Sequence, residues 1–332
     1  RILLLGTTRR TIPEAWLTSV ERHENASRIQ LHRLGPKDLV HLLEDAFHSS
    51  RLAEELGVKI ALKSDGNPFF VFEILRGLRD ERYLTQSDAG TWIKTRDIQE
   101  ITIPSSVLDL IEARVVDLDD DERSLLDVAA CLGFEFDPLL VAAALDLDRT
   151  PALKMLARLE RKHRLVRSAG RRFVFDHHQV QEALYARVPE LLREDYHAAL
   201  AEALAHRCGA EPDGDAQVLL ADHFLEGGRG EEALRHLEPA LDHLAGKYEY
   251  DRVCRLARRA LDIPGVLRGA GRYRVLMRLS NASETTGRVA QRRETLEEAA
   301  DIAGDLGDPA LLGEVTIARA KQAAHDVGME VS

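Results

Sequence analysis

The sequence predicts a mainly α-helical chain whose last part is an array of helical repeats. Aromatic residues are only 5% of the 332 residues, while leucine and alanine are abundant, and this balance favours helices over β-sandwiches or barrels. Apolar residues recur through most of the chain at the i, i+3, i+4 spacing of amphipathic helices. A chain of this length is expected to form about two or three domains.

The chain opens with an apolar run, Ile2 to Leu5, followed by Gly6, which is typical of a strand buried on both faces of a parallel sheet. No comparable run follows in the first part of the chain, residues 1–103. Because a central strand needs neighbours for its backbone hydrogen bonds, we expect the other strands to lie upstream, in a longer protein of which this chain is the C-terminal part.

Helices are expected to fill most of residues 1–103. A helical pattern runs from Pro36 to Gly57, a second helix covers 58–64, and a third begins at Pro68 after a turn at Gly66-Asn67-Pro68. The polar stretch 86–101 predicts a loop with one short strand.

Residues 104–195 have the plan of a winged helix, with helices followed by a hairpin. One helix is expected to begin at Pro104, and another to begin at the acidic run after Leu118 and to end at Gly133. Two more are expected after pairs of a capping residue and a proline, Asp137-Pro138 and Thr150-Pro151.

The predicted hairpin of this part consists of two apolar segments, 165–166 and 173–175. They flank the turn sequence Ser168 to Arg171, which is typical of a connection between two antiparallel strands.

Residues 196–332 predict an α-solenoid of tetratricopeptide-like repeats. Two expected helices, Tyr273 to Gly287 and Ala310 to Gly328, end at glycines 41 residues apart, which is close to the period of such arrays. The last helix lacks the polar cap that ends a solenoid, so we expect the array to be truncated. Its concave surface predicts a protein partner or a small ligand, with four candidate residues: His236, Tyr248, Tyr250 and Arg252.

Composition narrows the classes of function. A net charge of −11 disfavours a protein whose whole surface binds nucleic acid, although it leaves room for a local basic patch. Cys131, Cys208 and Cys254 form no CxxC pair and predict reduced thiols. No apolar run approaches the ~20 residues of a spanning helix, and no signal sequence opens the chain. The sequence therefore predicts a cytoplasmic protein with no membrane partner.

Four features in order resemble a STAND-type signal-transduction ATPase. They are Gly6-Thr7-Thr8-Arg9 after a strand, Gly66-Asn67-Pro68-Phe69-Phe70, Phe175-Asp176-His177 leading into Gln181-Glu182-Ala183-Leu184-Tyr185, and the helical repeats. The resemblance covers nearly the whole chain. Its subgroup is similar to the bacterial regulator ATPases found beside Ser/Thr kinase, cyclase or LuxR-type output domains, which serve signal transduction and transcription regulation.

The resemblance implies an AAA-like nucleotide module coupled to a winged helix and repeats. Residues 1–103 would then be the last sheet strand and helical lid of that module. The resemblance also implies ATP or ADP, with Mg, as cofactors of the intact protein, and an upstream ATPase portion and an output domain as partners.

Arg9 and the turn at residues 66–68 match two nucleotide-binding elements of the family. Arg9 corresponds to the sensor arginine near the γ-phosphate, where a fixed cation stabilises the transferring charge; the alternative is a surface arginine at a strand end. Gly66, Asn67 and Pro68 correspond to the lid turn, with the proline near the adenine; the alternative is ordinary helix punctuation.

His177 matches the winged-helix histidine that contacts the β-phosphate of ADP in closed members. Its neighbour His178 leaves the register open by one residue. A histidine can donate a hydrogen bond to phosphate, and its charge changes near neutral pH. The alternatives are a helix-capping or surface histidine, and an Asp-His-His metal site.

The chain departs from the family at the catalytic centre. It has no GxxxxGK[ST] phosphate loop and no strand that ends in paired acids for Mg²⁺. We therefore assign no catalytic residues and expect this chain alone neither to hydrolyse ATP nor to bind nucleotide tightly.

A second feature is a basic segment, residues 149–172, with nine Lys and Arg residues against one Glu. We define its basic face by five residues: Lys154, Arg158, Arg161, Lys162 and Arg164. Winged helices use these elements on DNA, but the face could also meet acidic parts of the same protein or remain solvated.

The sequence thus predicts the regulatory portion of a nucleotide-dependent switch whose repeats sense a partner or ligand. One alternative is a winged-helix regulator that binds DNA directly. Another is a nucleotide-independent repeat scaffold for protein partners.

Overall fold

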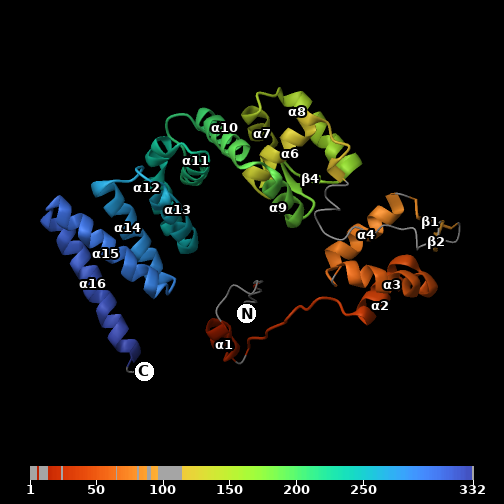
Figure 1. The fold of residues 1–332 in the computed structure, drawn as a ribbon, viewed down its shortest axis with the longest axis horizontal. Coiled ribbons are helices and arrows are strands. Elements are labelled where there is room, and N and C mark those ends of the chain that lie inside the picture. The colour runs from red at the N-terminus through yellow and green to blue at the C-terminus, as the bar shows by residue number, and fades with distance from the viewer. Residues whose placement is uncertain are drawn as a thin grey trace. The chain divides into compact units, whose positions relative to one another are not determined.

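The computed structural model is mainly α-helical, as the sequence predicts (Figure 1). It describes residues 6, 14–23, 25–64, 66–80, 82–87, 91–95 and 114–330. The chain divides into two compact units, Arg1–Leu110 and Ile111–Ser332. The predicted strand from Ile2 to Leu5 lies outside the described residues.

The first unit contains a small helical core. Its described elements are α1 (Glu14–Glu21), α2 (Pro36–Phe47), α3 (Ser50–Ser64), α4 (Pro68–Asp80), β1 (Leu84–Gln86) and β2 (Trp92–Lys94). Leu43 of α2, Ile60 of α3 and Val71 of α4 are fully buried together. The helix expected from Pro68 is confirmed, and it keeps Ile74 and Leu78 in the same core.

The helical pattern predicted from Pro36 to Gly57 is interrupted earlier than expected. His48 adopts a left-handed conformation with φ 52°, which ends α2, and the hydroxyl of Ser49 accepts a hydrogen bond from the Leu52 amide at the start of α3. Gly57 instead lies inside α3, where an added Cβ would stand 3.0 Å from Val40 Cγ2. The glycine is therefore a point of close helix packing and not a helix end.

The stretch 86–101, predicted to hold one short strand, contains β2, and β1 begins just before it at Leu84. β1 and β2 pair antiparallel, with Thr85 opposite Ile93. β1 was not predicted because three residues are too few to show an alternating pattern.

The second unit begins with helices and a small sheet. The described elements are α6 (Asp120–Leu132), β3 (Glu135–Phe136), α7 (Pro138–Ala144), α8 (Arg149–Arg158), a π-helical turn (Leu159–His163), β4 (Val166–Ala169) and β5 (Arg172–Phe175). The helix expected from Pro104 falls mostly outside the described residues.

Capping residues fix the ends of these helices. Asp119 and Glu122 form a capping box on α6, and Gly133 ends it as predicted. Asp137 caps α7 through a 2.9 Å bond from the Leu139 amide, again as predicted. The prediction for α8 was wrong: its cap is Asp148, and Pro151 lies within the first turn, where a missing amide hydrogen costs nothing.

The hairpin predicted at residues 165–175 is confirmed. β4 pairs antiparallel with β5, with Arg167 opposite Val174, and Phe175 is fully buried. β3 adds to the other side of β5, giving the order β3-β5-β4. The third strand brings Phe136 against Phe175 in the core, with ring centroids 5.4 Å apart.

A succession of helices completes the second unit (Figure 1). They are α9 (His178–Arg187), α10 (Glu190–Cys208), α11 (Gly214–Glu226), α12 (Gly230–Gly246), α13 (Tyr250–Asp262), α14 (Gly269–Thr285), α15 (Val289–Leu306) and α16 (Pro309–Glu330). Each helix from α10 onward packs on the next.

Three turns of this array share one geometry. Gly228, Tyr248 and Gly287 occupy the left-handed region with φ of 66°, 61° and 70°. In each turn the amide that follows donates to the carbonyl five residues earlier: Arg229 to Phe224, Glu249 to Leu244, and Arg288 to Ser283. This Schellman-type closure reverses the chain within three residues, so consecutive helices run back along one another.

The predicted 41-residue spacing does not join equivalent turns. Gly287 lies in the turn after α14, but α16 continues through Gly328 to Glu330. A glycine inside a helix costs only about 1 kcal/mol, so it did not end this helix.

Ion pairs join α11 to α13 and α12 to α14, helices that are two places apart in the chain. Arg259 of α13 pairs with Glu226 of α11 at 2.8 Å, and Arg274 and Arg278 of α14 pair with Glu238 and Asp242 of α12. These pairs fix how successive helix pairs stack, which is the arrangement of a solenoid.

Two further findings concern the described part of the chain as a whole. No helix within it is both long and apolar enough to cross a membrane. All the cysteines are free, with Cys131 and Cys254 buried. Burial, as the main cause, raises the pKa of the Cys131 thiol to about 12.

Tyr248 provides a test of the turn geometry. A non-glycine residue in the left-handed region is strained, and this ring is 80% exposed, so it contributes little packing. Tyr248→Gly is expected to raise the free energy of unfolding by about 0.5–1 kcal/mol in urea titrations.

Tyr250→Gly is the matched control, because it removes the same Tyr248–Tyr250 ring contact from a residue in the first turn of α13. It is expected to lower the stability. An equal loss in both variants would contradict the strained-turn interpretation.

Candidate functional site

The turn at residues 66–68 lies in the first unit and requires glycine. Gly66 has φ +66°, and its carbonyl accepts a 2.8 Å hydrogen bond from the Leu34 amide. A Cβ at this position would stand 2.4 Å from the Leu34 carbonyl oxygen. The close approach holds the segment before α2 against the start of α4, and no other residue type fits.

Asn67 and Pro68 start α4. The Asn67 side chain accepts from the Phe69 amide at 3.1 Å, its carbonyl accepts from Val71, and Pro68 occupies the first helical position. These contacts fit the helix-punctuation alternative. They also leave the Pro68 ring exposed on a rigid turn, where a ligand could pack against it. Arg9, the third candidate of the first unit, lies outside the described residues.

His177 lies in the second unit, where β5 ends and α9 begins. It is the N-cap of α9: its Nδ1 accepts a 3.2 Å hydrogen bond from the Gln179 amide, and the ring is half-buried. An accepting Nδ1 carries no proton, so in the neutral ring the proton is on Nε2. The capping role and a donor role toward a ligand therefore use different atoms of one ring.

The structure separates the two neighbouring histidines. The exposed His178 ring stacks on Phe134, with centroids 3.7 Å apart, whereas His177 is fixed by the helix terminus. Among the described residues, no group of His, Cys, Asp and Glu is arranged to hold a metal ion, and Asp176, His177 and His178 form no such group.

The helix that follows His177 is tied to both of its neighbours. Gln181 donates a 2.8 Å hydrogen bond to the Ala130 carbonyl at the end of α6. The Tyr185 hydroxyl lies 3.4 Å from His197 Nε2 of α10. A displacement of the α9 N-terminus would therefore change its contacts with α6 and with α10, the first helix of the array.

A buried histidine pair, His197 and His223, was not found from the sequence. Their Nδ1 atoms are 2.8 Å apart between α10 and α11. The pKa of His197 is lowered to about 3, mainly by burial and also by the charge of His223. The pKa of His223 is lowered to about 4, mainly by burial and also by the charge of Arg259. Both rings are therefore neutral at pH 7, and one donates to the other. The sequence signal for this pair was that each histidine falls on the apolar face of its helix. That signal alone is weak evidence for a buried histidine.

The basic face is only partly available to an outside partner. Arg158 forms ion pairs with both Asp119 and Glu122, the capping-box residues of α6, and the Glu122 side chain is 2% exposed. Its charge is thus used within the fold, where it balances a buried carboxylate.

The other members of the basic face are exposed: Lys154, Arg161, Lys162 and Arg164. Arg161 donates from Nε to the Ala157 carbonyl at 3.2 Å, and Arg164 adopts φ 51° at the end of the π-helical turn. Glu160, the single acid of the basic segment, accepts from the Ser168 amide at 2.8 Å, so it braces the hairpin.

The repeat candidates divide into packing and exposed residues. His236 stacks on Phe224 and its Nδ1 lies 2.7 Å from Gln217 Oε1, which identifies it as a packing residue. Arg252 pairs with Glu249 at 2.6 Å. Tyr248 is the exposed residue of a strained turn.

Comparisons with known proteins give limited similarity. No family model matches the chain. Hybrid signal transduction histidine kinase G of Dictyostelium discoideum is 27% identical over 136 residues, which is 40% of this chain and 4% of that protein's length.

Among solved structures, a Signal Transduction ATPase with Numerous Domains that has a tetratricopeptide repeat sensor, from Pyrococcus horikoshii, aligns with 88% of this chain and 57% of its own. The identity is 14% and the TM-score is 0.27. This chain therefore spans less than two thirds of either protein.

The histidine pair predicts a loss of stability in acid. The folded-state pKa values of about 3 and 4 lie below the ordinary histidine value of 6.5, so the unfolded chain binds protons first as the pH falls. The contribution is fully present above about pH 6.5 and is lost as the pH falls toward 4. We expect the second unit to lose about 2–3 kcal/mol between pH 7 and pH 4.5 in urea titrations.

His223→Gln keeps an uncharged hydrogen-bonding group at the pair and is expected to flatten this acid dependence. His206→Gln changes an exposed histidine and should leave it steep. Asp127, whose pKa burial raises to about 6, acts in the opposite direction but is common to all three proteins. An equally steep loss in His223→Gln would contradict the role of the pair.

Proposed function

We propose that this chain is the regulatory portion of a cytoplasmic, STAND-type nucleotide switch that serves signal transduction. The observation that carries the proposal is the position of His177. Its Nδ1 is engaged by the backbone at the start of α9, so the ring is held in one orientation with its proton on Nε2. Such a ring can donate to a β-phosphate oxygen of ADP.

The surroundings of His177 suit an anion. The N-terminus of α9 carries the positive end of the helix dipole, which favours phosphate. The family resemblance implies that Arg9 and the lid turn at Gly66-Asn67-Pro68 also take part in nucleotide binding in the intact protein. ATP or ADP, with Mg, would be held mainly by a phosphate loop outside this chain and would supply the phosphate groups.

The proposed switch transmits nucleotide state through α9. If ADP holds His177, exchange for ATP releases the α9 N-terminus, and the Gln181 and Tyr185 contacts carry the change toward α6 and α10. The repeats would bias this equilibrium by binding a protein partner or small ligand. The similarity to a segment of a signalling histidine kinase agrees with such a role.

His177 allows the latch and the cap to be tested separately. His177→Asn preserves helix capping, since Asn is among the best N-caps, but its shorter side chain cannot reach as far as Nε2. In the intact polypeptide that contains the phosphate loop, ADP affinity by calorimetry is expected to fall about 10-fold or more in both His177→Asn and His177→Ala, as for loss of a charge-assisted bond.

Thermal stability should fall only in His177→Ala, which removes the cap, and His178→Asn serves as the neighbouring control with unchanged ADP affinity. If His177→Asn binds ADP as the wild type does, the residue is a cap and the latch proposal is wrong.

A second candidate function is direct DNA binding by residues 104–195. The observation in its favour is that Lys154, Arg161 and Lys162 are exposed together with Arg164 along α8 and the turn after it. Arg158 is a poor probe of this function, because its removal would leave Glu122 buried without its partner.

The triple substitution Lys154→Ala, Arg161→Ala and Lys162→Ala tests DNA binding without that defect. If the face binds DNA, duplex retardation should weaken steeply with salt, and the triple variant should lower the slope of log K against log salt by about 3. Arg252→Ala, Arg255→Ala and Arg258→Ala on α13 remove equal charge elsewhere. Equal retardation of the wild type and both triple variants would exclude this face as a DNA site.

A further inference from the structure

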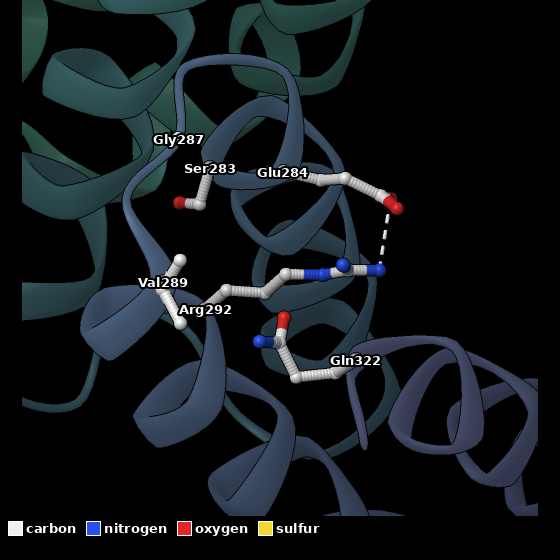
Figure 2. Close-up of a pocket in the computed structure, with 6 residues that line it drawn as sticks. All are labelled: Ser283, Glu284, Gly287, Val289, Arg292 and Gln322. Atoms are coloured by element: carbon white, nitrogen blue, oxygen red, sulfur yellow. Dashed lines mark ion pairs between the residues drawn. The ribbon is translucent and has the colours of Figure 1, made fainter. Parts of the chain in front are cut away.

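The last helices of the array enclose a small polar cavity that no predicted site includes. It has a volume of about 100 Å³ and is lined by Ser283, Glu284, Gly287, Val289, Arg292 and Gln322. Figure 2 shows Arg292 of α15 extending between Ser283 and Glu284 of α14 on one side and Gln322 of α16 on the other. The cavity thus joins α14, α15 and α16.

Arg292 is a buried charge with an unused donor. Its side chain is 4% exposed, and Nη2 pairs with Glu284 Oε2 at 2.8 Å. Its Nε is buried and has no hydrogen-bond partner. Buried polar groups are almost always paired, and an unpaired donor on a charged group is costly. The site therefore lacks an acceptor.

The rest of the lining adds donors and sets the shape. Ser283, whose hydroxyl lies 3.9 Å from Cys254 Sγ, and Gln322 both line the cavity, and both residues are buried. Val289 supplies an apolar wall beside them. Glu284 is half-exposed and pairs with Nη2 of the guanidinium, which leaves Nε as the buried donor of Arg292 without a partner.

The volume limits the size of an occupant. One water needs about 10–15 Å³ by this measure, so about 100 Å³ accommodates a molecule of about four to seven non-hydrogen atoms. A nucleotide or a peptide backbone is too large.

We propose that this cavity binds the carboxylate of a small organic acid, with one oxygen accepting from Arg292 Nε and the other from Ser283 or Gln322. A carboxylate is the planar acceptor that arginine matches best. The proposal names a class of ligand for the sensing role described under the proposed function. The biological role of the site rests on that proposed function. The binding itself needs no nucleotide and is measured without it.

Bound acid would fasten the start of α15 to α16. Arg292 follows the left-handed Gly287 turn by five residues, and Gln322 lies in the middle of α16. Filling the cavity would therefore reduce the freedom of the last helix and make the end of the array more rigid.

The test titrates the full 332-residue chain with sodium acetate, sodium propionate and glycine, against sodium chloride at equal ionic strength. Ligand-detected NMR should report binding in the millimolar range, which is usual for so few atoms. Methylammonium chloride is the cation control, and an acetylated Gly-Glu-Gly amide carries the same group on a peptide. Neither control should bind.

Arg292→Gln is expected to weaken acetate or propionate binding about 10-fold or more, and Ser283→Ala and Gln322→Leu about 3- to 10-fold. Arg293→Gln makes the same change at the exposed neighbour and should bind as the wild type does. If Arg292→Gln does not fold, the Ser283 and Gln322 variants decide.

Three results would overturn the proposal. They are no binding of any acid by the wild type, which leaves a water-filled cavity; binding that survives in the Ser283 and Gln322 variants; and tighter binding of the peptide than of the free acids. Because none of these measurements uses nucleotide, failure here leaves the nucleotide switch standing, and failure of the switch leaves this site standing.

Discussion

The array depends on one constraint: each helix buries an apolar face that it cannot cover alone, so the chain must reverse within a few residues. The turns at Gly228, Tyr248 and Gly287 achieve this by placing one residue in the left-handed region and closing the helix end with the same backbone bond. At two of these positions glycine removes the strain. At Tyr248 the packing of the two adjacent helices outweighs the preference of a non-glycine residue for a right-handed backbone conformation, so Tyr248 adopts the left-handed one.

Once the helices are stacked, charges and polar groups are satisfied between elements. Arg158 balances the buried Glu122, and the paired histidines satisfy each other between α10 and α11. Arg292 Nε belongs to a small set of buried side-chain atoms in the described residues that have no hydrogen-bond partner, and its side chain lines a cavity. A buried charged donor that lacks an acceptor beside a cavity supports a ligand there, since buried polar groups are usually paired.

Local sequence signals predicted the elements whose causes are local. The Asp137 cap, the end of α6 at Gly133 and the β4–β5 hairpin are encoded within a few residues. The histidine pair and the Arg292 cavity join residues of different helices, so no window of the chain contains their cause. The break at His48 and the continuation through Gly328 were missed because a non-glycine residue rarely ends a helix in the left-handed region and a single glycine does not always end one. For the candidate site, the turn at residues 66–68 and the cap at His177 fit their motifs, while nucleotide contact stays a prediction.

Hydrogen exchange on the intact polypeptide, with and without ADP, tests the central claim that nucleotide state is read at the lid turn and at α9. The account predicts that ADP slows amide exchange at residues 66–71 and at 177–183, and that an ATP analogue does not slow the second segment. Equal exchange at both segments in the free and ADP-bound protein would contradict it, because neither element would then respond to nucleotide.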